Sequence, residues 1–413
     1  MSLLVLFFFL MLFMPTIYQG PRALLLIVIL LVTFRTDKKL YINKDIRLFW
    51  MLTYFVAVYA LLIGIFRGNP GTISCIPFFL IWPILYLYFI IRCDRITIIK
   101  TLLKTITFGG LIVASLNILL IANAYMLHIN FLNLVGDALK CEFNIQEGFA
   151  EYFSPSGNHL PYLIYFCTTL LFLKPKTIDV KKKYLLITIG LSIIDIALSN
   201  RRAMWLVILI LPLILFAFFS FLKKQKKILL KIGVITFASG LMIFTLLINF
   251  LDFDYVYSEV LSSFDFSGDE SSNLERVIQG KSLWEDFLKR PLLGSGLGHV
   301  SHYVRNMETP WTYELTYNYT LASVGLFGFI IYAISTCWIC IKAVSVAKKS
   351  SEYATMLIPQ IMGLISLLII SISNPYLVKF DFVWAIFLPL ATINAIYNEK
   401  RREKTYFSIL KSR

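Results

Sequence analysis

Residues 203–222 read AMWLVILILPLILFAFFSFL, and none of these 20 residues carries a charged side chain. The hydrocarbon core of a bilayer is about 30 Å thick, and a helix of about 20 apolar residues spans it. Backbone amides inside that core must hydrogen-bond to one another, so an apolar run of this length predicts a transmembrane helix. The fold class of the chain depends on how often such runs recur.

Similar runs recur along the whole chain of 413 residues. The composition, 58% hydrophobic and 15% charged, excludes an ordinary soluble protein, which would expose large apolar areas to water. We predict an all-α fold, with residues 1–413 forming a single polytopic membrane domain of about 12 transmembrane helices. The predicted spans are 2–18, 21–34, 48–66, 71–91, 105–125, 160–173, 184–199, 203–222, 232–251, 320–341, 354–373 and 382–397. The runs 21–34 and 160–173 are short and are the least secure crossings.

The charge of the connecting segments predicts the orientation. Of the 39 Lys and Arg residues, 28 fall in alternate segments: 35–47, 92–104, 174–183, 223–231, 342–353 and 398–413. Cytoplasmic loops are enriched in Lys and Arg, so we expect both termini in the cytoplasm.

The N-terminal segment lacks a basic region and a small-residue cleavage site, and we expect it to remain as the first span. The net charge of +15 then reflects topology and anionic lipid, and nucleic acid is not an expected partner.

Two outer segments are long, 126–159 and 252–319, and the second lies between the predicted ninth and tenth helices. The other outer connections have only a few residues, so we expect the active site in 252–319. Two isolated histidines of the first segment are interpreted as plain surface residues, His128 and His159. Of the six cysteines only Cys141 lies well out in an outer segment, so no disulfide within one chain is expected there.

One outer turn, between the spans 184–199 and 203–222, carries the adjacent arginines Arg201 and Arg202. Lys and Arg are disfavoured on this side of the membrane, and a guanidinium can hold a phosphate or carboxylate with two parallel hydrogen bonds. The alternative is that both side chains anchor the helix end by reaching to lipid headgroups. Asp195 lies about one helical turn earlier, and we expect it to pair with one of them because an unpaired acid at that depth is costly.

The outer segment 252–319 contains a predicted amphipathic helix. Apolar residues recur at helical intervals from Leu274 to Leu288, which predicts a helix near the membrane interface. Pro291 ends it, and the sequence GSGLG follows at 294–298. This is not a nucleotide loop, because the Lys-Ser/Thr of a Walker A motif and a preceding strand are missing. We expect these glycines to let the backbone approach neighbouring helices or a substrate closely.

His299 and His302 follow these glycines, and Glu308 and Glu314 come further on. A zinc protease motif needs two histidines four residues apart that flank a glutamate, and a spacing of three does not match it. We therefore predict neither a metal nor a cofactor.

Three groups of residues together resemble one family. They are SNRRA at 199–203; Arg276, Trp284, Pro291, Gly294 and Gly296 in the large outer segment; and Glu314 ahead of GLFG at 325–328. The chain resembles the O-antigen polymerase and ligase superfamily. Members of that superfamily are similar in architecture throughout, with about a dozen spans and one large periplasmic loop in the second half.

The resemblance implies a metal-independent glycosyltransferase with a lipid-linked donor, a glycan carried on undecaprenyl diphosphate at the outer face of the bacterial cytoplasmic membrane. The outer arginines of the family are thought to hold the diphosphate. By position that role falls to Arg201 or Arg202 and to Arg276, with Arg305 as a further candidate. Fixed cations at a water-poor helix end stabilise the charge on a departing diphosphate, so no metal is required. Membrane lipids, a chain-length regulator and a flippase are further candidate partners.

The position ahead of Gly325 distinguishes two branches of the family. Ligases have a His, then an amide or Ser, nine residues, and a Gly-x-x-Gly pattern, whereas here the His place holds Glu314 and the amide place Leu315. This departure argues against a ligase that works through that histidine, so we favour a polymerase of O-antigen or capsular-type polysaccharide. Ligase transfer to lipid A-core is an alternative. A lipid-linked glycan flippase is another, although transport predicts ionisable residues inside the helices and here they concentrate in the outer segment.

Transfer from an anomeric carbon needs a base near the acceptor hydroxyl, and the candidates are Glu314 and His302. Glu314 has two other interpretations, an ion pair with Arg305 or another arginine, and a solvated loop residue. Ring faces can stack on sugars, and the candidates for substrate binding are Trp284, His299, Trp311, Tyr313 and Tyr317. For the aromatic residues the alternative is a belt at the membrane interface.

Overall fold

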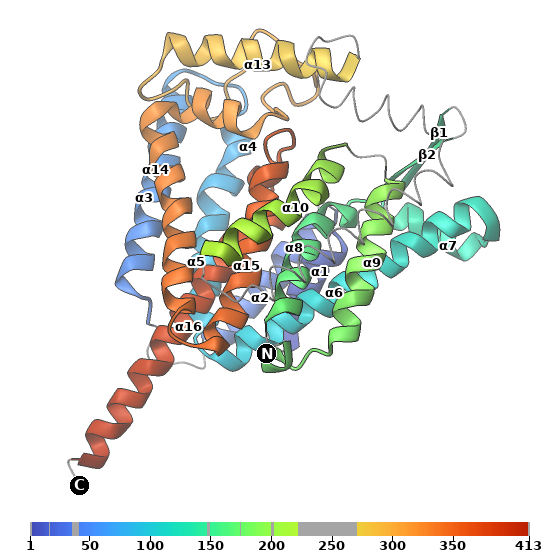
Figure 1. Cartoon of the computed structure of the whole chain (residues 1–413). Helices are drawn as coiled ribbons and strands as arrows, with labels where there is room; N and C mark the ends of the chain where they lie inside the picture. Colours follow the sequence, from blue (N-terminus) through green and yellow to red (C-terminus); the bar gives the residue numbers. More distant parts are fainter. Residues whose placement is uncertain are drawn as a thin grey trace. The chain divides into compact units, whose positions relative to one another are not determined.

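The computed structural model describes residues 2–15, 17–34, 41–146, 149–173, 175–199, 202–221 and 271–411 (Figure 1). The fold is all-α and polytopic, as predicted, and within these ranges one hairpin supplies the strands. The first helices are α1 (Ser2–Phe13), α2 (Gln19–Phe34), α3 (Lys44–Phe66), α4 (Thr72–Ile76), the π-helical turn η1 (Pro77–Ile81), α5 (Trp82–Arg92), α6 (Ile96–Ala122), the π-helical turn η2 (Asn123–Leu127) and α7 (Asn130–Ala138). The strands β1 (Glu142–Gln146) and β2 (Phe149–Phe153) follow.

Further elements follow within the described ranges. They are the 3-10 turn η3 (Ser156–His159), α8 (Leu160–Phe172), the 3-10 turn η4 (Pro175–Ile178), α9 (Lys182–Leu198), α10 (Arg202–Phe221), α13 (Ser271–Lys289), α14 (Thr316–Ala347), α15 (Ser351–Ile370), the 3-10 turn η5 (Tyr376–Val378) and α16 (Phe380–Lys411).

Every predicted span falls on helical structure, except 232–251, which lies outside the described residues. Seven helices in the described ranges are long and apolar enough to cross a membrane: Lys44–Phe66, Thr72–Arg92, Ile96–Leu127, Ala203–Ser220, Thr316–Ala347, Ser351–Ile370 and Phe380–Glu403. The two runs predicted to be short, 21–34 and 160–173, correspond to helices of 16 and 13 residues. These lengths are below the roughly 20 residues that a full crossing requires.

Contacts divide the chain into two compact units. Unit 1 comprises Met1–Ile29, Thr101–Asp265 and Met362–Ile370, and unit 2 comprises Leu30–Lys100, Phe266–Ile361 and Ser371–Arg413. Each unit thus joins segments that lie far apart in the sequence, and helices α2, α6 and α15 belong in part to both.

Helix α8 forms the centre of unit 1. Every residue from Leu160 to Leu170 is buried, and α9 and α10 pack against this helix. Tyr165 Oη donates a hydrogen bond of 2.7 Å to the carbonyl of Val207 in α10. The helix is buried on all sides, and its sequence is accordingly mostly apolar. For this reason it resembles a membrane span in the sequence, although it has only 13 residues.

The first long outer segment, 126–159, is more structured than a loop. It holds α7, η3 and the antiparallel pair β1–β2, in which Glu142 lies opposite Phe153. His128 is exposed, as expected. The expectation for His159 is wrong, because this side chain is fully buried and its Nε2 lies 3.2 Å from the carbonyl oxygen of Met11. The reason is its place at the end of η3, directly before the buried helix α8.

In unit 2, the predicted cytoplasmic segments contact one another, and the predicted outer segments contact one another. Ion pairs join the predicted cytoplasmic segments at one end: Asp45 with Lys342 at 2.5 Å, Lys100 with Glu352 at 2.6 Å, and Asp94 with Arg402. At the other end, Thr316 Oγ1 donates to the carbonyl of Asn374 at 3.0 Å, which joins two predicted outer segments. The grouping of the segments therefore follows the predicted alternation.

The helix predicted at Leu274–Leu288 is present as α13, and it lies across one end of α3 and α14 (Figure 1). The face that it buries is mainly polar, since Gln279 and Ser282 are buried there beside Leu283. Several of its apolar side chains are exposed instead, Leu274, Ile278, Trp284 and Leu288. Such an outward apolar face suits a place at the membrane interface, which stays a prediction.

A break in α14 receives the glycine-rich segment 294–298. Gly325 has a φ of 66°, so the helix is interrupted there and carbonyl groups of the preceding turn lose their partners within the helix. The amides of Ser295 and Gly296 take their place, donating to the carbonyls of Ala322 at 2.7 Å and Ser323 at 2.9 Å. The glycine-rich segment is thereby fixed to α14 by backbone hydrogen bonds.

The same segment also contacts the connection between α3 and α4. The amide of Gly71 donates to the carbonyl of Gly298 at 3.0 Å, and Arg67 Nη1 donates to the carbonyl of Gly294 at 2.7 Å. A Cβ atom on Gly298 would lie only 2.2 Å from the carbonyl carbon of Gly71. The expectation that these glycines permit close approach to neighbouring helices is confirmed.

Candidate active site

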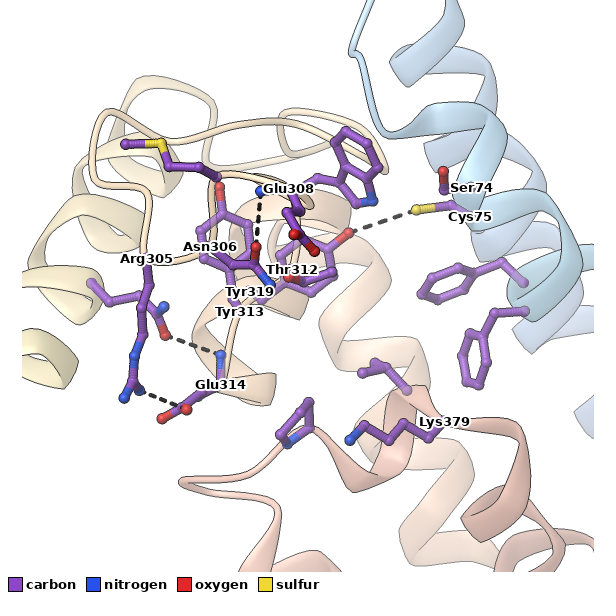
Figure 2. Close-up of a pocket in the computed structure, with 17 residues that line it drawn as sticks. Ser74, Cys75, Arg305, Asn306, Glu308, Thr312, Tyr313, Glu314, Tyr319 and Lys379 are labelled. Carbon is purple, nitrogen blue, oxygen red and sulfur yellow. Dashed lines mark hydrogen bonds and ion pairs between the residues drawn. The ribbon is translucent and has the colours of Figure 1, made fainter. Parts of the chain in front are cut away.

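A cavity of about 710 Å³ lies within unit 2. Its walls come from α4 and η1, α13, the segment 305–314, α14 and the residues around η5 (Figure 2). One part of the lining is aromatic: Phe78, Phe79, Trp311, Tyr313 and Tyr319. Another part is charged: Arg305, Glu308, Glu314 and Lys379. Ring faces combined with a few polar groups are typical of small-molecule sites, and about 300–1,000 Å³ is their usual size.

Glu314 lies in the cavity wall between two arginines. Its Oε2 accepts from Arg276 Nε at 3.1 Å, and its Oε1 contacts Arg305 Nη1 at 2.6 Å. Arg305 Nε also contacts Glu275 Oε2 at 2.8 Å. All these side chains are roughly one-third exposed, so water screens each pair and its contribution to stability is about 0–1 kcal/mol. The structure thus shows the ion-pair arrangement for Glu314, and its role as a base stays a prediction.

Gln279 fixes the backbone beside Glu314. This buried side chain of α13 accepts through Oε1 from the amides of Glu314 at 3.1 Å and Leu315 at 3.3 Å. Leu315 is the N-cap residue of α14, and its own side chain provides no cap. A Gln side chain that accepts from the N-cap amide is half of a capping box, here supplied by another helix. Gln279 therefore ties α13 to the start of α14 at the candidate site.

Three stacked rings support the aromatic part of the wall. The rings of Tyr313 and Tyr319 have centroids 5.2 Å apart, and the ring of His299 stacks on Tyr319 at 5.7 Å. Tyr313 Oη accepts from the amide of Ser301 at 2.6 Å. Burial raises the pKa of Tyr313 to about 12, so its phenol is neutral near pH 7 and is unsuited to act as a base.

His299 lies behind these tyrosines and is not among the residues that line the cavity. Its Nδ1 lies 3.3 Å from Ser323 Oγ, and its Nε2 lies 3.9 Å from Asp286 Oδ2. Burial lowers the pKa of His299 to about 4, although the nearby Asp286 carboxylate acts in the opposite direction. The imidazole is therefore neutral near pH 7 and serves as a packing partner for the tyrosines.

The other predicted site residues of the large outer segment fall into two groups. Trp311 and Tyr313 line the cavity, whereas Trp284, His302 and Tyr317 do not. The His302 side chain is 59% exposed, and its Nδ1 lies 3.1 Å from Ser282 Oγ. Within the described ranges, no group of three or more His, Cys, Asp or Glu residues is placed to hold a metal ion.

Several lining residues were not predicted from the sequence, among them Gln279, Asn306, Glu308 and Lys379. In Figure 2, Lys379 lies across the cavity from Arg305 and Glu314. Lys379 follows η5 in a predicted outer connection, where the charge rule disfavours a cation. Lys379 therefore carries the same sequence signal as Arg201 and Arg202, a cation on the side of the membrane where cations are disfavoured. Gln279 carried no such signal, because an uncharged residue in an amphipathic helix is unremarkable.

The arginine turn belongs to unit 1. Arg202 begins α10, and Arg201 lies outside the described residues. Asp195 is buried in α9, and its Oδ2 accepts from Asn117 Nδ2 at 2.7 Å. Asn117 Oδ1 in turn accepts from Tyr152 Oη at 3.1 Å, beside a void of about 10 Å³, the size of one water molecule. An amide thus stabilises the buried acid, and its pairing with an arginine stays a prediction.

One comparison with known families covers part of this chain. Residues 187–333 match the family model of the O-antigen ligase, a region that includes the arginine turn, α13 and Glu314. No curated protein matches the chain. The seven described helices that are long and apolar enough to cross a membrane, together with this match, support a multi-pass membrane protein. Over residues 187–333 the chain is similar to the O-antigen polymerase and ligase superfamily, whose members are glycan polymerases and ligases.

Proposed function

We propose that this enzyme polymerises oligosaccharide repeat units carried on undecaprenyl diphosphate, at the outer face of the bacterial cytoplasmic membrane. The product is a surface polysaccharide of the O-antigen or capsular type. The observation that carries the proposal is Glu314, which lies between Arg276 and Arg305 in the wall of a cavity with aromatic sides. Cations for a diphosphate, a carboxylate for a hydroxyl proton and ring faces for sugars are thus gathered in one place.

The reaction is a displacement at the anomeric carbon of the donor. The acceptor hydroxyl oxygen forms the new bond to that carbon while the bond from carbon to the diphosphate oxygen breaks. The electron pair leaves with the diphosphate, and the hydroxyl proton moves to Glu314. Arg276 and Arg305 stabilise the charge that develops on the departing oxygens, and Arg201 and Arg202 are proposed for the same role from the family resemblance.

The cavity is proposed as the place of the acceptor sugars. Glu314 and the ring of Tyr313 both line it, so a sugar stacked on the ring could bring a hydroxyl toward the carboxylate. Asn306, Glu308 and Lys379 add hydrogen-bonding groups to the same walls. In such a cavity the aromatic rings stack on the faces of a sugar, and the polar side chains hydrogen-bond to its hydroxyl groups.

Ligase activity is the second candidate, because the matching family model is described as the O-antigen ligase. Glu314 at the histidine place favours the polymerase. Deletion of the gene separates the two when the surface glycan is examined on a gel. We expect the ladder to collapse to one repeat unit on its core acceptor. Complete loss of core-linked glycan would indicate a ligase, and an unchanged pattern would exclude both activities.

A further inference from the structure

The candidate site contains a continuous chain of opposite charges. Glu275 contacts Arg305, Arg305 contacts Glu314, and Glu314 contacts Arg276. Both arginines proposed for the diphosphate therefore already have a carboxylate partner, and the two glutamates balance the charge of the two arginines. Each oxygen of Glu314 also contacts one guanidinium group, so the carboxylate is oriented toward the two arginines.

We propose that Glu314 is a resident anion that the diphosphate of the donor replaces. The diphosphate takes over Arg276 and the Nη1 of Arg305, and the displaced carboxylate turns into the cavity toward the acceptor hydroxyl. This inference rests on the proposed function and adds an order of events to it. The base becomes available only after the donor has bound.

The contacts allow this exchange to occur at the side chain alone. Glu275 holds Arg305 through Nε, a different nitrogen from the one that contacts Glu314, so Arg305 stays in place when Glu314 leaves. Gln279 holds the amides of Glu314 and Leu315, so the backbone is anchored too. Glu314 already lines the cavity of about 710 Å³, which gives its side chain space to turn.

The charges favour the exchange as well. A diphosphate carries more negative charge than one carboxylate, and it offers several oxygens to the planar donor groups of two guanidiniums. The pairs that it replaces are roughly one-third exposed and therefore weak. Without the exchange, the donor would place its charge next to arginines that a carboxylate already neutralises.

Binding of a donor analogue to the purified full-length protein tests the inference, with farnesyl diphosphate as the probe and calorimetry as the readout. Glu314→Gln keeps the shape of the side chain and removes the competing charge. We expect this variant to bind the probe about three- to fivefold more tightly than the parent. Glu314→Ala should show the same direction, which covers the case in which the glutamine variant does not fold.

Glu308→Gln is the matched control. Glu308 lines the same cavity, and among the described residues it makes no ion pair with either arginine. It therefore measures the general effect of removing one negative charge, and we expect a smaller gain in affinity. If Glu314→Gln gains no more than Glu308→Gln, or binds the probe less tightly than the parent, the exchange is wrong.

Arg276→Ala distinguishes failure of the exchange from failure of the proposed function. We expect this variant to lose most of its affinity for farnesyl diphosphate. If the parent and Arg276→Ala bind the probe equally, or if the parent does not bind it, the arginines are not a diphosphate site and both proposals fail. Loss of affinity in Arg276→Ala without any gain in the Glu314 variants would leave the proposed function standing and remove the exchange alone.

Discussion

At the scale of single residues, the setting of Arg276 determines how much its loss should cost. Its side chain is 34% exposed, so a contact to a diphosphate there is weaker than in a dry site. We expect Arg276→Ala to slow polymerisation by about 10- to 100-fold, which corresponds to about 1.5–3 kcal/mol for a hydrogen bond to a charged group. Arg276→Lys should recover only part of the rate, because an ammonium cannot make the two-pronged contact.

The measurement is the rate of glycan polymerisation by purified protein, normalised to the amount of inserted protein. Lys281→Ala is the control, because Lys281 is an exposed cation on the same helix and does not line the cavity. We expect the control to keep the parental rate. A parental rate in Arg276→Ala would remove this residue from the diphosphate site.

His299 gives the stability of the protein a pH dependence. Burial lowers its pKa in the folded protein to about 4, whereas an unfolded histidine titrates near 6.5. The unfolded chain therefore binds more protons between these values, and the contribution is full above about pH 6.5 and is lost as the pH falls toward 4. Between pH 7 and pH 5 we expect the wild type to lose about 2 kcal/mol from this group.

Thermal unfolding of the parent and of His299→Phe at both pH values checks this expectation. Phenylalanine keeps the ring stack with Tyr319 but cannot be protonated. The melting temperature of the parent should therefore fall more between pH 7 and pH 5 than that of the variant. Equal falls in both proteins would show that His299 does not titrate as its burial implies.

Sequence patterns located only part of the candidate site. Glu314 could be found because a fixed spacing separates it from Gly325, and Trp311 and Tyr313 lie close to it in the chain. The salt bridge to Arg276 joins residues 38 positions apart, and Gln279 reaches Glu314 from another helix. Contacts of this kind depend on how α13 packs against α14, which residue spacing does not encode. The same holds for His302, which is exposed and does not line the cavity.

At the scale of elements, the glycine-rich segment should be the most sensitive to small substitutions. Gly298 has a φ of 73°, and an added Cβ would lie 2.2 Å from the backbone of Gly71 and Thr72. We expect Gly298→Ala to destabilise the protein by several kcal/mol, because neither backbone can move without breaking the hydrogen bonds of the segment. A lower melting temperature or less inserted protein would report this effect.

Gly190 offers a matched control within helix α9. An added Cβ there would meet nothing within 4 Å, and the residue is helical. We expect Gly190→Ala to be neutral or to stabilise by up to about 1 kcal/mol, since alanine restricts the unfolded chain. If both alanine variants had the same melting temperature, the close packing of the 294–298 segment would be contradicted.

Hydropathy and periodicity predicted the elements better than their ends. The uncharged run at 203–222 became α10, and the period in 274–288 became α13. The break at Gly325 was less visible, because GLFG lies inside an apolar run and a helix tolerates one glycine. Burial of His159 was missed for a similar reason, since the sequence SPSGNH at 154–159, before a short apolar run, resembles a loop. In both cases the local sequence is compatible with two conformations or environments, and tertiary packing selects one of them.

At the scale of the whole molecule, the charge pattern predicts which ends of the helices face the cytoplasm. Ion pairs already group several of the basic segments at one end of unit 2, such as Asp45 with Lys342 and Lys100 with Glu352. Reporter fusions after residues 40, 178, 226, 347 and 413 should report the cytoplasm, and fusions near 140 and 270 should report the outside. A cytoplasmic signal at 270 would contradict the proposed site at the outer face of the membrane.

We propose that Glu314 and its arginines catalyse polymerisation of a lipid-diphosphate-linked glycan. The most direct measurement mixes purified protein with one lipid-linked repeat unit and follows the lengths of the products. We predict that the parent makes a ladder and releases the lipid diphosphate, and that Glu314→Gln loses most of its rate because an amide cannot take the hydroxyl proton. No ladder from the parent would contradict the polymerase, and a near-parental rate in Glu314→Gln would contradict Glu314 as the base.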